Sequence, residues 1–283
     1  MYKIINWYTK QFPFPYRGLK FFLSFLKSMG LYHREFCKKL HNGSFFLTRP
    51  SEHIQQQLFW YGYYEKDAIL TWEQMIQADA VVLDIGANTG YYSIIAAKKS
   101  RHIYAFEPGS GNRKKLEENI QLNKLVNITV LPYAVSDKQG DTELFIAGDD
   151  NTGMNSLEQP GNFSGHKEVV AVVSIDDWVA ENNIPGISLI KIDVEGSEMK
   201  VLKGMQAVIE EHQPVFFMEV IGQLLMQSGH SVNDIYNFLF SRGYNAYGII
   251  KPLRLKRITT PKEGDSIVFV HASAVFPAAI GLE

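Results

Sequence analysis

From about residue 80 onward, short apolar runs alternate with longer amphipathic stretches. Runs of four to eight apolar residues predict buried strands, and apolar positions that recur every three or four residues predict helices. The predicted strands cover residues 81–86, 102–108, 127–135, 187–194 and 214–220. The predicted helices between them cover residues 91–99, 112–125 and 198–211. Strands that alternate with helices indicate βαβ units, so we expect an α/β fold with a parallel sheet.

The last third of the chain follows a different pattern. A helix is predicted at 232–241, and the runs 244–250 and 266–272 are predicted to pair as a hairpin. The stretch 137–174 is rich in Gly and Asn and contains alternating apolar and polar positions, so we expect a hairpin-like insertion between the third and fourth parallel strands.

The first fifty residues differ from the rest in charge. They hold nine Lys and Arg against one acid, a net of +8, whereas the other 233 residues hold 19 basic and 29 acidic side chains. They also hold 13 of the 36 aromatic residues. This asymmetry predicts a basic, aromatic and helical N-terminal segment over 1–60, followed by a domain over 61–283.

Residues 18–32 within this segment are predicted to form an amphipathic helix. Its apolar positions, three or four residues apart, are Leu19, Phe22, Leu26 and Met29. The helix could rest on an anionic membrane, cover a substrate cleft, form a dimer contact or simply pack on the main domain. The segment also carries aromatic side chains that could stack on a ligand, namely Trp7, Tyr8, Tyr16 and Tyr32.

Composition narrows the class of protein. A chain that is 46% hydrophobic and 20% charged is neither disordered nor fibrous. Its single cysteine, Cys37, excludes a disulfide framework and a zinc site built from cysteines. The sequence has no run of 18 apolar residues and no apolar core of a signal peptide. We therefore expect a cytoplasmic protein, with peripheral contact at the inner membrane face as an option through residues 1–50.

The first predicted strand runs into a glycine turn, DIGANTG, at residues 84–90. Such a turn lets backbone N–H groups approach a ligand closely at the carboxyl edge of a sheet. Glu107 ends the next strand, where a carboxylate can accept both hydroxyls of a ribose. A dinucleotide fingerprint would need glycine at Asn88, and Asp84 would repel a pyrophosphate. S-adenosylmethionine carries a ribose, an ammonium and a sulfonium but no phosphate, so the pattern favours this donor over NAD.

Three ionisable side chains share one face near the end of the strand at 187–194: Lys191, Asp193 and Glu195. A central parallel strand is normally apolar, so these residues indicate either a catalytic site or a self-satisfied charge network. Asp193, or as second choice Glu195, could take a proton from a substrate hydroxyl, and Lys191 could orient it. With Glu219 the two acids could also hold Mg²⁺, but the sequence shows no converging ligands and we predict no metal site.

The motifs DIGANTGYYS, FEP, AVSD, SIDDW and KIDVEGSEMKVLKGM, in this order, resemble those of the FkbM-type S-adenosylmethionine-dependent methyltransferases. The resemblance extends over about residues 61–270. It implies the class I methyltransferase fold, a Rossmann-like, seven-stranded and mostly parallel sheet whose last strand is antiparallel. It also implies O-methylation of a hydroxyl, on a sugar or glycan or on a polyketide-like natural product.

The resemblance also implies roles for the glycine turn. Gly86, Asn88 and Gly90 would line the methionine part of the donor, with Ala87 in the same turn. Asp84 would lie near the donor's ammonium.

The remaining donor contacts follow from the other motifs. Glu107 would hold the ribose, with Pro108 beside it, and Ala134 to Asp137, including Ser136, would meet the adenine. Asp193 would lie at both the donor and the reacting atoms. The segment Asn155-Ser156-Leu157, in the insertion, resembles a family segment that could face the acceptor, and an ordinary turn would explain it equally well.

Two other classes of protein remain open at this stage: a nicotinamide-dependent oxidoreductase and a catalytically silent module that only binds the donor. Nucleic acid is not an expected partner, because the part of the chain that carries the motifs is acidic. The oligomeric state is not readable from the sequence.

Overall fold

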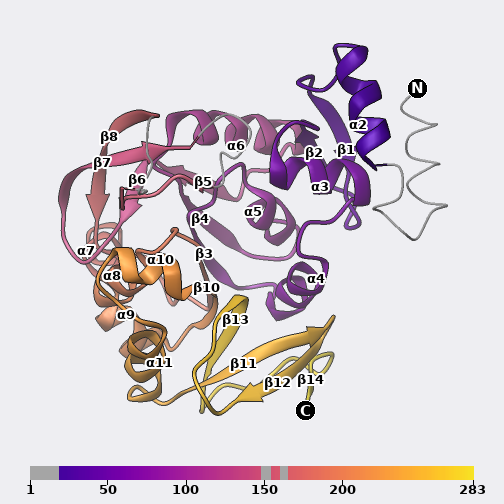
Figure 1. The fold of residues 1–283 in the computed structure, drawn as a ribbon. Coiled ribbons are helices and arrows are strands. Elements are labelled where there is room, and N and C mark those ends of the chain that lie inside the picture. The colour runs from indigo at the N-terminus through magenta and orange to yellow at the C-terminus, as the bar shows by residue number, and fades with distance from the viewer. Residues whose placement is uncertain (1–18, 148–153, 160–164) are drawn as a thin grey trace.

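The computed structural model describes residues 19–147, 154–159 and 165–283. Within these residues the chain forms three layers, with one large sheet in the middle and helices on both faces (Figure 1). The sheet has nine strands in the order β14-β12-β11-β13-β10-β9-β3-β4-β5. Their bounds are β3 Val81–Ile85, β4 His102–Phe106, β5 Ile128–Leu131, β9 Leu189–Ile192, β10 Val215–Val220, β11 Tyr244–Lys251, β12 Arg254–Ile258, β13 Gly264–His271 and β14 Gly281–Leu282.

The predicted seven-stranded sheet forms the main part of this arrangement. β3 pairs in parallel with β4 on one side and with β9 on the other. β13 runs antiparallel between β10 and β11, as predicted for the last strand of the fold. The predicted pair 244–250 and 266–272 does pair, but β12 intervenes in the chain and lies on the other edge of β11, where β14 extends the sheet further.

Both faces of the sheet are covered, which explains the continuous apolar runs of its strands. Leu83 of β3 faces one core and Val82 faces the other. The helices that contribute to the first core are α7 Ile175–Asn182, α8 Glu198–Lys203, α9 Gln206–His212, α10 Gly222–Gln227 and α11 Val232–Phe240. Those that contribute to the second are α3 His53–Tyr61, α4 Lys66–Met75 and α5 Tyr91–Ala96. α6, Ser110–Asn123, packs through Leu116 against Ala105 of β4.

The helix predicted at 198–211 is divided into α8 and α9. The carboxylate of Asp176 caps the second piece, because its oxygens accept hydrogen bonds from the backbone N–H groups of Ala207 and Val208, both at 3.0 Å. This gives Asp176 a structural role at a helix N-terminus.

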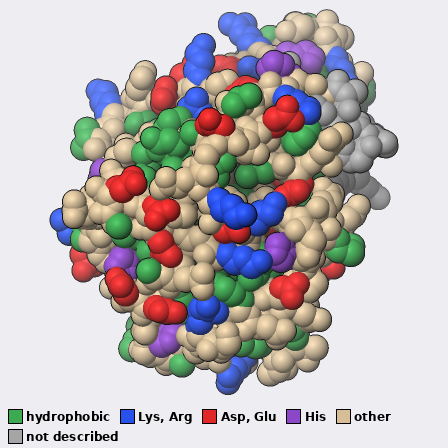
Figure 2. All heavy atoms as spheres, turned by 90° about the vertical axis from the view of Figure 1, so that its left-hand side faces the viewer, with side chains coloured by type: hydrophobic (Ala, Val, Ile, Leu, Met, Phe, Trp, Pro, Cys, Tyr) green, Lys and Arg blue, Asp and Glu red, His purple; other side chains and the backbone are tan. Residues whose placement is uncertain are grey.

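The predicted strand 127–135 is divided as well. Pro132 separates β5 from β6, Tyr133–Val135, which leaves the main sheet and joins β7, Gly140–Ile146, and β8, His166–Val173. Proline has no N–H to donate, so it often marks such a break. β7 and β8 lie inside 137–174 and pair antiparallel. On the side of the molecule that carries them, acidic and basic side chains are interspersed (Figure 2).

The N-terminal segment packs against the main body rather than standing apart from it. The predicted helix at 18–32 is present as α2, Leu19–Ser28, whose Leu26 is fully buried against Phe59 and Trp60 of α3. An unpredicted hairpin follows, β1 Phe36–Lys39 and β2 Phe45–Thr48. Its strands have only four residues each, too short for a clear alternation in the sequence.

The expected boundary near residue 60 falls inside α3, and Phe46 of β2 shares a core with Trp72 of α4. Trp7, Tyr8 and Tyr16 lie outside the described residues. Among the helices that the structure describes, none has the length and apolar character needed to cross a membrane.

Trp72 joins the N-terminal elements to the sheet, and its replacement tests this packing. Its ring is fully buried, with centroids 5.5 Å from Tyr92 and 5.2 Å from Phe217. We expect Trp72→Ala to lower the free energy of unfolding by about 3–5 kcal/mol, measured by urea denaturation. Val126→Ala, at a position that is 94% exposed, should change it by less than about 0.5 kcal/mol. Equal effects of the two variants would contradict this view of the core.

Candidate active site

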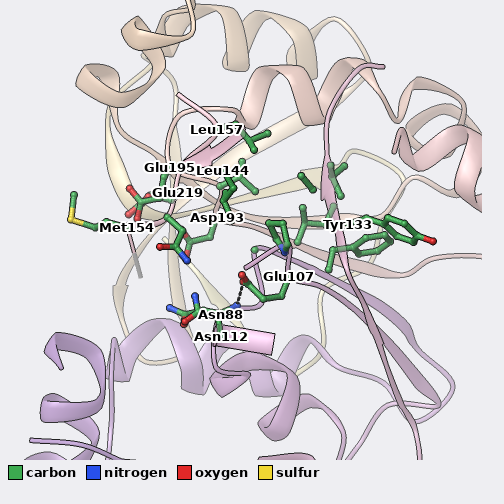
Figure 3. A pocket seen from close by; sticks show the side chains of 18 of the residues that line it. Asn88, Glu107, Asn112, Tyr133, Leu144, Met154, Leu157, Asp193, Glu195 and Glu219 are labelled. Atoms are coloured by element: carbon green, nitrogen blue, oxygen red, sulfur yellow. Dashed lines mark hydrogen bonds between the residues drawn. The ribbon is translucent and has the colours of Figure 1, made fainter. Parts of the chain in front are cut away.

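A cavity of about 290 Å³ opens at the carboxyl ends of the central strands (Figure 3). It lies where the order of the sheet reverses, between β3 and β9, which is the usual ligand site of an open α/β sheet. The predicted site residues that line it are Gly86, Asn88, Glu107, Pro108, Ala134, Asp193 and Glu195. The fold therefore gathers residues from four separate motifs around one space.

The turn after β3 is shaped by a close backbone approach. Gly86 has a left-handed φ of 79°, and a Cβ there would collide with the carbonyl of Asp193. Asn88 is also left-handed, with φ 52°, and its N–H donates to Oε2 of Glu107 at 2.8 Å. The side-chain oxygen of Asn88 has no hydrogen-bond partner within the described protein. The turn thus presents the side-chain oxygen of Asn88 to the cavity, and its backbone at Gly86 lies directly against that of Asp193.

The carboxylate of Glu107 lines the cavity and is fixed in position by two backbone N–H groups. Oε1 accepts from the N–H of Gly109 at 2.8 Å, while Oε2 accepts from Asn88. Burial raises the pKa of Glu107 to about 7, although these backbone donors oppose the rise. A carboxylate has about four acceptor positions, so Glu107 can still accept the two hydroxyls of a ribose.

Lys191 and Asp193 form an ion pair at the edge of the cavity, with Nζ and Oδ2 2.7 Å apart. Lys191 is buried, and its Nζ lies 4.7 Å from the centre of the Tyr92 ring. Burial alone would lower the pKa of Lys191, but Asp193 and Asp84 together raise it above its ordinary value. Lys191 is therefore a permanent cation that fixes the position of the Asp193 carboxylate from behind.

Asp193, Glu195 and Glu219 converge on one side of the cavity, while Tyr133 lies on the other (Figure 3). One carboxylate oxygen from each lies within 4.8 Å of the others. Burial, followed by the charge of Asp193, raises the pKa of Glu195 to about 8 and that of Glu219 to about 9. Three acids held this close repel one another, so the cluster favours a cationic group beside it. The convergence that the sequence did not show is thus present, and Mg²⁺ stays an alternative to an organic cation.

Five predicted site residues do not line the cavity: Asp84, Ala87, Gly90, Ser136 and Lys191. Asp84 is buried beneath the turn and accepts a hydrogen bond from Ser93. Ala87 and Gly90 pack against Leu116 of α6. The N–H of Ser136 pairs with the carbonyl of Val173, which draws this residue into the small sheet. These five residues support the cavity or the sheet around it rather than forming its surface.

Several wall residues were not among the site residues predicted from the sequence, although the segment with Asn155 and Leu157 was named there as one that could face the acceptor. Tyr133 and Leu144 come from β6 and β7, and Met154, Asn155 and Leu157 come from the insertion. Of these, only the Asn155–Leu157 segment carried a signal, its likeness to a family segment. His53, Ile54 and Tyr64 come from α3 and the loop after it. No motif marks them, because the sequence does not show which distant loop covers the sheet edge.

The chain matches the model of the methyltransferase FkbM domain over residues 84–246. Hexuronic acid methyltransferase AglP of Haloferax volcanii is 28% identical to it over 148 residues, which are 52% of this chain and 58% of AglP. Methyltransferase 1 of Beauveria bassiana is 25% identical over 154 residues, 47% of this chain and 60% of that protein. The chain therefore spans less than two thirds of the length of these relatives.

The structure of methyltransferase FkbM from Methylobacillus flagellatus is 18% identical to this chain. It aligns with a TM-score of 0.47, over 78% of this chain and 48% of the other. The family model, by contrast, covers more than half of the chain and includes the glycine turn, Glu107 and the Lys191–Glu195 motif. The chain belongs to the FkbM family of methyltransferases, which take the methyl group from S-adenosylmethionine.

Proposed function

We propose that this protein transfers a methyl group from S-adenosylmethionine to a hydroxyl of a sugar or glycan. One observation carries the proposal: a single cavity joins a ribose-type carboxylate, Glu107, to an acid that is paired with a buried lysine, Asp193. Glu107 suits the ribose of the donor, and Asp193 suits an acceptor hydroxyl that must lose a proton.

The lining of the cavity suggests how the donor would bind. The ribose hydroxyls would donate to Glu107, and the methionine part would follow the turn at Gly86 and Asn88. The adenine would lie toward Ala134 and Leu144, on the apolar side. Within the acid cluster, Glu195 and Glu219 would then face the ammonium and the sulfonium, whose positive charges relieve the repulsion of the cluster, while Asp193 would face the acceptor.

When bound, S-adenosylmethionine supplies an electrophilic methyl group on a positively charged sulfur. Asp193 would accept the proton of the acceptor hydroxyl as its oxygen forms the new bond to carbon, while the electron pair of the carbon–sulfur bond stays with sulfur. Lys191 would hold the carboxylate in line for this transfer through its 2.7 Å contact. The cavity walls would contribute by orienting the acceptor, which is a major source of rate in such displacements.

The choice of a sugar rests on two observations. AglP, the relative noted above, is a hexuronic acid methyltransferase. The cavity also has an aromatic wall in Tyr64 and adaptable side chains such as Met154, which suit the C–H face of a sugar. A polyketide or another natural product is the alternative acceptor. A silent module that binds the donor without transfer would show binding and no turnover.

Donor binding tests the first half of the proposal and the role of the acid cluster together. In calorimetric titrations we expect S-adenosylmethionine to bind and NAD to give no signal. At neutral pH Glu195 and Glu219 are largely protonated in the free protein, because their pKa values are raised to about 8 and 9. A cationic ligand favours their ionised forms, so binding should release protons, and the dissociation constant should fall from pH 7 to 9 by up to about tenfold per pH unit for each proton released.

S-adenosylhomocysteine is the matched control, because it lacks the sulfonium charge and should show a shallower dependence on pH. Titrations with EDTA and with MgCl₂ should agree. A requirement for Mg²⁺ would assign the cluster to a metal ion instead. Binding of NAD alone would reject the methyltransferase assignment of this cavity.

Asp193→Asn tests the proposed base. The amide keeps the shape of the side chain but cannot accept the proton, so we expect turnover to fall by at least about 100-fold. Turnover is measured with labelled donor and an acceptor found by screening glycans. Donor affinity, measured by calorimetry, should stay nearly unchanged. An equal loss of donor affinity would assign Asp193 to the donor site rather than to catalysis.

Glu107→Gln tests the ribose contact. Hydrogen bonds to a charged group contribute about 1.5–3 kcal/mol, so we expect donor affinity to fall by about 10- to 150-fold. Ser136→Ala is the control, because Ser136 does not line the cavity and, among the described residues, its hydroxyl donates to the carboxylate of Asp137 at 3.2 Å. Stronger weakening by Ser136→Ala than by Glu107→Gln would place the ribose elsewhere.

A further inference from the structure

The geometry points to a positioning role for Ser156, in the insertion. We propose that its hydroxyl fixes the turn that carries Glu195, so that the insertion and the acid cluster are set in place together. This inference rests on the proposed function, in which the Glu195 carboxylate faces the donor.

The turn at Val194–Gly196 has an unusual backbone. Glu195 is left-handed, with φ 52°, a conformation that is strained for a residue with a side chain. Gly196 follows with φ 105°, and a Cβ there would lie 2.6 Å from the carbonyl oxygen of Leu224. Such a conformation persists only where its surroundings hold it.

Three side chains hold this turn from different directions. Glu198 accepts from the N–H of Gly196 at 3.0 Å, and Ser228 donates to the carbonyl of Gly196 at 2.7 Å. Ser156 donates to the carbonyl of Glu195 itself, at 3.0 Å. The first two residues belong to α8 and the end of α10, whereas Ser156 reaches the turn from the insertion. Ser156 is thus the contact that links the turn to the insertion.

Ser156 is well placed for this contact, because it is itself held firmly. It is 6% exposed, and it exchanges two backbone hydrogen bonds with Phe145 of β7, at 2.9 and 3.2 Å. The hydroxyl oxygen of Ser156 also accepts from the N–H of Glu158 at 3.1 Å, and Glu158 forms an ion pair with Lys200 of α8. The hydroxyl therefore has a fixed position relative to both the small sheet and the helix after the turn.

This arrangement joins two parts of the donor site. The neighbours of Ser156 in the chain, Asn155 and Leu157, line the cavity, as does Leu144 from β7. The segment that lines the cavity therefore also holds the carbonyl of Glu195. Loss of the hydroxyl would let the Glu195 turn relax, and its carboxylate would lose its alignment with the cluster.

Calorimetric affinity for S-adenosylmethionine tests this role without any need for the acceptor. A hydrogen bond contributes about 0.5–1.5 kcal/mol net, so Ser156→Ala should weaken binding by about 2- to 12-fold. Ser156→Val should weaken it equally, and Ser156→Thr, which has the shape of Val but keeps a hydroxyl, should restore it. Ser100→Ala is the matched control, since Ser100 is a buried serine that donates to the carbonyl of Ala96 at 3.0 Å and does not line the cavity.

A double-mutant cycle with Glu195→Gln separates positioning from packing. If Ser156 acts through the Glu195 carboxylate, Ser156→Ala should have less than about a twofold effect in the Glu195→Gln background. An undiminished loss in that background, or equal losses for Thr and Val, would overturn the inference. If the wild type binds the donor tightly and Ser156→Ala binds it equally well, the inference is also overturned, but the proposed function is not affected. Failure of the wild type to bind the donor would reject the proposed function and the inference with it.

Discussion

The site depends on one close approach between two stretches of backbone. Gly86, after β3, lies against the carbonyl of Asp193, after β9, with no room for a side chain between them. Because these neighbouring strands are parallel, their carboxyl ends meet at the same edge, and the contact sets the two following turns side by side. The first turn carries Asn88, whose N–H donates to Glu107, and the second carries Asp193 and Glu195. Any side chain at position 86 would push apart the two turns whose side chains line the proposed site.

The charges of the site are arranged in layers. Asp84 and Lys191 lie beneath the surface, where Lys191 is paired with Asp193 and packs on the ring of Tyr92. Above them, burial first and then the charge of Asp193 raise the pKa values of Glu195 and Glu219. A permanent cation below and closely spaced acids above, which ionise more readily beside a positive charge, create a place for a ligand with positive charge. This electrostatic arrangement agrees with a sulfonium donor far better than with a dinucleotide.

Segments both outside and inside the family match complete the cavity. His53, Ile54 and Tyr64 precede residue 84, and they belong to elements that the N-terminal hairpin and α4 hold against the sheet. On the other side, the insertion supplies Leu144 and the Asn155–Leu157 segment. Because a fold does not by itself fix which molecule a protein acts on, walls such as these can differ between proteins that share the fold.

The sequence by itself determined the order of strands and helices from residue 80, the glycine turn and the carboxylates at the strand ends, since these follow from local periodicity and short motifs. It did not reveal the break at Pro132, the added strands β12 and β14, or the short hairpin β1–β2, because local patterns there are weak or overridden by packing. It also placed Asp84 near the ammonium of the donor, whereas Asp84 is buried beneath the turn and does not line the cavity. Only the tertiary structure decided that Glu219 joins Asp193 and Glu195, and that Tyr64 and Ser156 reach the site. Contacts between residues so distant in the chain depend on how strands pair and loops cross, which no local sequence pattern encodes.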